Sequence, residues 1–137
     1  MIVKSFNLEN KIEIINKYKI HLFYGENLGL KQDIKFKIKK VNKKVEFINL
    51  LQEEIIKNSS ILISEIRNKS LFQEKKIIII DQVSDKILDI ISSIEKEIQD
   101  EKVYLFGDLL DKKSKLRNLL EKSTDCGVTP CYKDDEQ

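Results

Sequence analysis

The chain of 137 residues is 41% hydrophobic and 35% charged, which suits one globular domain with a core of its own. Its 25 basic and 23 acidic residues leave a formal net charge of only +2, so the chain as a whole lacks the positive excess of proteins that bind nucleic acids or anionic membranes. No stretch approaches the roughly 18 apolar residues of a membrane span, and the N-terminus lacks the layout of a signal peptide, so we expect a cytoplasmic protein.

Strands and helices are predicted to alternate along the chain. In order, they are a strand at 20–24, a helix at 28–40, a strand at 45–48, helices at 50–57 and 61–68, a strand at 75–81, a helix at 84–98, a strand at 103–106, a helix at 114–122 and a strand at 126–128. The aliphatic run 77–80 is typical of a strand buried on both faces of a parallel sheet. The pattern predicts a single α/β domain over residues 1–137, with a parallel five-stranded sheet between two layers of helices.

The connection between the first strand and the first helix has the position of a phosphate-binding loop without its sequence. A working P-loop places four residues between two glycines and follows the second with lysine and a hydroxyl residue, which together hold phosphates and magnesium. Here only three residues separate Gly25 from Gly29. Leu30 then intervenes before Lys31, and Gln32 replaces the hydroxyl residue. We interpret Gly25, Gly29 and Lys31 as a degenerate nucleotide loop and expect no cofactor.

Other catalytic or metal-binding sets are equally incomplete. Asp81 ends the central predicted strand, where an aspartate could hold magnesium, but Gln82 follows it and supplies no second carboxylate. Cys126 and Cys131 have the wrong spacing for a zinc knuckle and His21 is remote in sequence, so we expect two reduced thiols and no metal site. No Ser-His-Asp set or Cys-His pair on one element is recognisable. We therefore expect no intrinsic catalysis.

The adjacent pair Leu71 and Phe72 is unusual because it lies in a polar stretch between a predicted helix and the strand at 75–81. A connecting loop in a globular domain is normally polar. Two large hydrophobic side chains in such a place either fold back onto the core or wait for a pocket on a partner. The residues alone leave both explanations open.

The order of these features resembles the N-terminal domain of the delta subunit of bacterial DNA polymerase III, a component of the sliding-clamp loader. The resemblance rests on Phe-Tyr-Gly-Glu-Asn at 23–27, Ser-Leu-Phe at 70–72 before an aliphatic strand, the segment 110–117, and Pro130 with Tyr132. It extends over almost the whole chain, although no single motif is strong. We interpret the segment 110–117 as structural, with Asp111 or Ser114 capping the following helix.

The resemblance implies an AAA+-like fold with a degenerate nucleotide site and no ATP hydrolysis of its own. It implies that the lid and collar domains of a full-length protein are absent here, and that the missing C-terminal domain contacts the gamma or tau and delta prime subunits. The beta sliding clamp is the implied partner, and DNA is contacted only within the full complex. Leu71 and Phe72 match the pair that enters a hydrophobic pocket on the clamp and helps to open the ring.

Two other functions remain as alternatives: a small P-loop-type ATPase or kinase with an unusual loop, and an unrelated α/β protein-interaction domain. The first would bind ATP with magnesium, and the second would bury both Leu71 and Phe72. The densest basic patch is interpreted as a solvated face, because the chain uses lysine heavily throughout. It contains Lys35, Lys37, Lys39, Lys40, Lys43 and Lys44.

Overall fold

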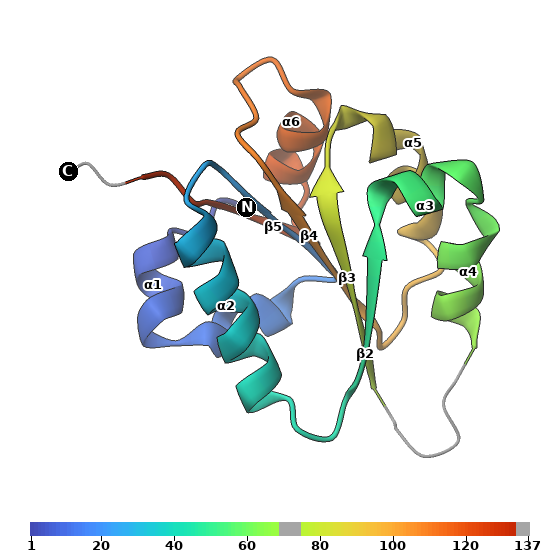
Figure 1. Cartoon of the computed structure of the whole chain (residues 1–137), viewed down its shortest axis with the longest axis horizontal. Helices are drawn as coiled ribbons and strands as arrows, with labels where there is room; N and C mark the ends of the chain where they lie inside the picture. Colours follow the sequence, from blue (N-terminus) through green and yellow to red (C-terminus); the bar gives the residue numbers. More distant parts are fainter. Residues whose placement is uncertain (69–74, 134–137) are drawn as a thin grey trace.

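The computed structural model describes residues 1–68 and 75–133, and these residues form a five-stranded parallel sheet (Figure 1). The strands are β1 (Ile20–Tyr24), β2 (Glu46–Leu51), β3 (Lys76–Val83), β4 (Lys102–Gly107) and β5 (Cys126–Pro130). Their order is β2-β3-β4-β1-β5, and every neighbouring pair is parallel. All carboxyl ends therefore lie at one edge of the sheet and all amino ends at the opposite edge.

Helices cover both faces of the sheet (Figure 1). The helical segments are α1 (Ser5–Asn10), η1 (Ile12–Lys17), α2 (Leu28–Val41), α3 (Gln52–Lys57), α4 (Ser60–Arg67), η2 (Asp85–Ile87), α5 (Leu88–Ile94) and α6 (Lys115–Lys122). One face carries α1, η1 and α2, and the other carries the remaining helical segments. The prediction of a three-layer α/β fold with a parallel five-stranded sheet is confirmed.

The aliphatic run of β3 divides between the two cores as a strand of period two requires. Ile78 and Ile80 pack into the core on the α3–α6 face. Ile77 and Ile79 pack into the core on the α1–α2 face. All four side chains are at least 97% buried, which is the environment that a continuous hydrophobic run predicts for a central parallel strand.

Three parts of the chain differ from the prediction. Leu50 and Leu51, which were predicted to begin the helix at 50–57, instead end β2, and α3 begins at Gln52. Residues before β1 form α1 and η1, which the sequence analysis did not predict, and Leu8 and Ile15 in them are buried in the core beside α2. The predicted helix at 84–98 is η2 followed by α5, which ends at Ile94. Glu97 donates its backbone N–H to Ile94 O at 2.8 Å, so the chain tightens into a turn there. Ile98 still reaches the core, because the turn preserves the side on which it lies.

The segment 110–117 is structural, as predicted. Ser114 accepts a hydrogen bond from the backbone N–H of Arg117 at 3.2 Å and so caps α6. Its own hydroxyl donates to Asp85 Oδ1 at 2.5 Å, and Asp85 Oδ2 accepts from the backbone N–H of Lys115 at 3.0 Å. The hydroxyl of Ser114 and the backbone N–H groups of Lys115 and Leu116 lower the pKa of Asp85. The segment therefore joins the start of α6 to η2.

Both cysteines are buried free thiols, and burial raises the pKa of the Cys131 thiol to about 12. A thiol with such a pKa stays protonated and is a poor nucleophile. Among residues 1–68 and 75–133, no group of three or more His, Cys, Asp or Glu side chains is arranged to hold a metal ion. Within the same ranges, no helix is long and apolar enough to cross a membrane.

Candidate functional site

A cleft of about 610 Å³ lies at the carboxyl edge of the sheet, between the start of α2 and the ends of β3 and β4. We call it the carboxyl-edge cleft. Open parallel sheets commonly bind ligands at this edge. Of the three predicted loop residues, Lys31 lines the cleft, whereas Gly25 and Gly29 do not. The residues lining it are Leu28, Lys31, Gln32, Lys35, Leu51, Asp81, Gln82, Val83, Ser84, Phe106, Gly107, Asp108, Leu109 and Leu110.

Gly25 makes the turn between β1 and α2 in a conformation that requires glycine. Its φ is +136°, and a Cβ atom added to it would lie 2.1 Å from the backbone oxygen of Cys131. Its N–H lies 3.3 Å from Gly107 O and 3.2 Å from Asp108 O. The first loop glycine therefore packs against the chain after β5 and after β4, and its amide is already bonded.

Three of the amides that follow Gly25 also have partners within the protein. The backbone N–H of Asn27 donates to Cys131 O at 3.0 Å. The side-chain oxygen of Asn27 accepts from the N–H of Leu30 at 3.0 Å, and the backbone carbonyl of Asn27 accepts from the N–H of Lys31 at 3.2 Å. A phosphate cradle needs several backbone N–H groups pointing at one anion. This loop uses those groups to cap α2 and to hold the segment after β5.

Lys31 is directed into the fold. Its side chain is only 8% exposed, and its Nζ donates to Gly107 O at 2.9 Å. Asp108 lies 3.5 Å away, but its side chain is fully exposed to solvent, so this ion pair contributes little. The lysine that would neutralise phosphates in a working loop therefore bonds a carbonyl at the end of β4.

The remaining charges of the cleft are paired with one another. Lys35 forms an ion pair with Asp81 and lies 4.7 Å from the centre of the Phe106 ring. The side chain of Gln52 bonds both the hydroxyl and the backbone N–H of Ser84, at 2.9 and 2.6 Å. Asp81 thus faces a lysine where a magnesium site would need a second oxygen ligand.

Gln82 has a positive φ of 58°, at the point where the register of β3 and β4 shifts between Asp81 and Val83. Such backbone conformations are uncommon outside glycine. Sequence analysis noted Asp81 and Gln82 but did not predict the Lys35 pair or the Gln52–Ser84 pair. The lysine was visible only as part of a basic run, and the second pair joins residues 32 positions apart.

The predicted clamp-binding residues Leu71 and Phe72 lie outside the described residues. The chain on either side of them is well anchored, because the buried Lys76 at the start of β3 bonds the end of α4. Its Nζ donates to Glu65 O at 2.7 Å and to Asn68 O at 2.8 Å. The end of α4 and the start of β3, which flank this connection, lie at the amino edge of the sheet, away from the carboxyl-edge cleft (Figure 1).

No protein-family model and no curated protein matches the chain. Among solved structures, the chain is similar to the DNA clamp loader delta protein of Bacillus subtilis, with a TM-score of 0.69 and 15% sequence identity over 93% of this chain. The match covers 42% of that protein's length, so this chain spans less than half of it. At this level of identity the likeness establishes a shared fold: the α/β domain described here has the same architecture as part of that protein.

Proposed function

We propose that this chain is the clamp-binding domain of a DNA clamp-loader delta subunit, without ATP hydrolysis of its own. The observation that carries the proposal is the shared fold with a clamp-loader delta protein. A role in DNA replication follows from that likeness. The beta sliding clamp is the proposed partner, and other loader subunits are proposed to contact parts of a longer protein beyond this domain.

The state of the nucleotide loop supports a binding role. The N–H groups of Gly25, Asn27, Leu30 and Lys31 are bonded within the protein, and the ammonium of Lys31 bonds a backbone carbonyl. An ATP molecule could use these five donors for its phosphates only after breaking the bonds that they make within the protein. A domain built in this way is suited to recognition.

We further propose that Leu71 and Phe72 enter a hydrophobic pocket on the clamp. Support comes from the anchoring of the chain on both sides of them by Lys76. Fixing both ends of a short connection lowers the entropy that must be lost when a partner binds it. Moving two large apolar side chains from water into a pocket stabilises a complex by roughly 1.5–3 kcal/mol each.

The test is binding of this chain to immobilised sliding clamp from the source organism. The double variant Leu71→Ala/Phe72→Ala is expected to raise the Kd roughly 100- to 10,000-fold, which corresponds to about 3–6 kcal/mol. The matched control is Phe6→Ala/Leu119→Ala, which removes the same two side-chain types from exposed positions elsewhere and should leave the Kd unchanged. Equal affinity of the wild type and the Leu71/Phe72 variant would refute the assignment.

A second variant examines the anchoring without changing the pair. Lys76→Met removes the bonds to Glu65 O and Asn68 O while keeping most of the buried side chain. We expect weaker clamp binding with a slower association rate, because the connection must then be ordered during binding. Lys75→Met, at the neighbouring exposed position, also removes one positive charge but none of these bonds. Comparing the clamp affinities of the two variants at high salt therefore separates the effect of anchoring from that of charge.

A further inference from the structure

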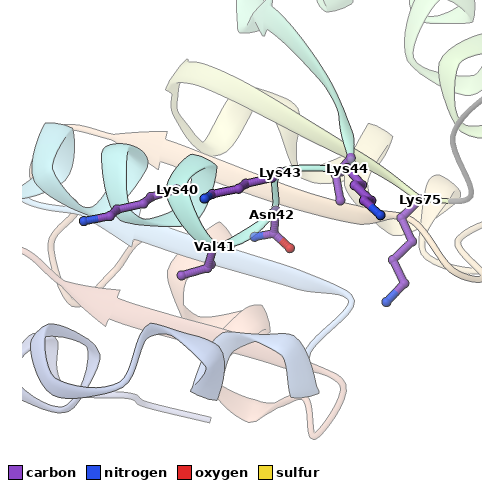
Figure 2. A pocket seen from close by; sticks show the side chains of 7 residues that line it. Lys40, Val41, Asn42, Lys43, Lys44 and Lys75 are labelled. Atoms are coloured by element: carbon purple, nitrogen blue, oxygen red, sulfur yellow. The ribbon is translucent and has the colours of Figure 1, made fainter.

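A second depression, of about 710 Å³, lies at the opposite edge of the sheet from the carboxyl-edge cleft. We call it the lysine pocket. Its walls are the end of α2, the connection from α2 to β2, and the residue before β3 (Figure 2). The lining residues are Lys40, Val41, Asn42, Lys43, Lys44, Val45 and Lys75. Four of these seven residues carry a positive charge, and none carries a negative one.

The predicted basic run divides into two parts in the structure. In its first part Lys35 pairs with Asp81 and Lys37 pairs with Asp33, whereas Lys39 forms no ion pair with a described carboxylate. The four lysines of the pocket form no ion pair with any carboxylate of the described residues. All four are exposed, and Figure 2 shows them spread along the pocket with Asn42 between Lys40 and Lys75. The positive charge of this surface is therefore available to a ligand.

More positive charge lies beside the pocket. Lys75 also lines an adjoining depression together with Lys102 and with Lys76, whose ammonium already lies 3.3 Å from Glu65 Oε1. The pKa of Lys102 is lowered, first by burial and next by the charges of Lys75 and Lys19. Like charges this close repel one another in the free domain, and an anionic ligand would relieve the repulsion. The one carboxylate that lines the adjoining depression is Asp100.

The position of Lys75 links the pocket to the proposed clamp contact. Lys75 immediately follows the connection that contains Leu71 and Phe72. Adjacent Cα atoms are about 3.8 Å apart, so the Cα atoms of Phe72 and Lys75, three residues apart, can be separated by at most about 11 Å. This upper limit is comparable with the screening length of about 8–10 Å at ordinary ionic strength, so charges on a partner that holds Phe72 can interact with the pocket, and they do so more strongly at low salt.

We propose that the lysine pocket binds a carboxylate-rich protein surface next to the apolar pocket that receives Leu71 and Phe72, on the same partner. This inference rests on the proposed function and adds a second, electrostatic contact to it. Exposed charges at the rim of an interface act mainly on the association rate and on its salt dependence. The lysine pocket thus steers the partner toward the Leu71–Phe72 connection.

The shape and charge of the pocket favour a protein over DNA. Duplex DNA presents one charge for about every 1.7 Å of its axis and is bound by extended basic surfaces. Here the four lysines of the pocket form one small cluster at the end of α2, its connection to β2 and the residue before β3, while the net charge of the chain is only +2. Val41, which is 49% exposed, also gives the pocket an apolar wall that suits a protein partner.

The test compares two charge-reversal variants of this chain for binding to the sliding clamp. Lys43→Glu/Lys44→Glu changes the pocket, and Lys112→Glu/Lys113→Glu makes the same change of net charge in the exposed loop after β4. We expect the pocket variant to raise the Kd about tenfold at low salt, mostly through slower association, and to approach the wild type at about 0.5 M salt. The loop variant should remain near the wild type throughout. Circular dichroism verifies that both variants are folded.

Each outcome separates this inference from the proposed function. If the wild type binds the clamp and both charge variants bind equally well, the lysine pocket has no role and the inference is overturned while clamp binding stands. If the wild type does not bind the clamp, both proposals fail. A parallel titration with duplex and single-stranded DNA covers the remaining case. Salt-sensitive DNA binding lost only in the pocket variant, with clamp binding unchanged, would make the pocket a nucleic-acid site and overturn the inference.

Discussion

Replacing Lys31 by methionine separates the two roles that a loop lysine can have. In this structure the ammonium donates to Gly107 O at 2.9 Å from a side chain that is 8% exposed. A hydrogen bond made by a charged group contributes about 1.5–3 kcal/mol. Methionine keeps the apolar part of the side chain and removes the ammonium, so the cost of burying that charge is also removed and partly offsets the lost hydrogen bond. We therefore expect Lys31→Met to lower the free energy of unfolding by about 1–2 kcal/mol.

The assay is urea unfolding followed by circular dichroism, together with calorimetry using ATP and magnesium. Lys37→Met is the control on the same helix, because Lys37 makes only a surface pair with Asp33 at 3.2 Å, and its stability should stay within about 0.5 kcal/mol of the wild type. The structural role of Lys31 would be refuted by a Lys31→Met variant as stable as the wild type. Micromolar ATP binding that Lys31→Met abolishes would show that the lysine binds phosphate and would revive the ATPase alternative.

Two further predictions concern the loop glycines and the buried histidine. Gly25→Ala should lower the free energy of unfolding by more than about 2 kcal/mol, because φ is +136° and the new Cβ meets Cys131 O at 2.1 Å. Gly29→Ala, inside α2 with no atom nearer than 3.7 Å to the new Cβ, should raise the free energy of unfolding by roughly 0.5–1 kcal/mol. Equal effects of the two substitutions in thermal unfolding would contradict this contrast. Burial, and secondarily the N-terminal charge, lowers the pKa of His21 to about 3. As the pH falls from about 6.5 to 5, the unfolded chain therefore binds a proton that the native state does not bind, and the free energy of unfolding falls by up to about 1.4 kcal/mol per pH unit. His21→Gln should reduce this dependence on pH, and an unchanged dependence would show that other groups cause it.

The sequence predicted the fold well where the hydrophobic pattern is strong. β1 has the predicted bounds, and the run 77–80 forms the central strand β3. It failed for α1, because the apolar residues of this short N-terminal segment are too few to show a helical period before packing against α2. The end of α5 was also missed, since residues 95–98 keep helical spacing while the backbone turns.

The candidate site was predictable only in part. The faulty spacing of Gly25 and Gly29 is visible in the sequence, and so is the absence of a hydroxyl residue after Lys31. The protein groups that the loop bonds in place of a phosphate are not visible in the sequence, because Gly107 and Cys131 are separated from the loop by more than 70 residues. The anchor at Lys76 was equally hidden, since a lysine beside an aliphatic strand is usually solvent-exposed.

The sequence by itself determined the alternation of strands and helices, the defect of the phosphate loop and the isolated Leu71–Phe72 pair, because these depend on local spacing and residue type. Only the tertiary structure decided what the charged residues do. Lys31, Lys35 and Lys76 are paired across the fold, whereas Lys43 and Lys44 have no counter-charge within the described part of the chain. Whether a charge is neutralised depends on its distance from the opposite charges that folding brings near it, and that distance cannot be read from the order of residues along the chain.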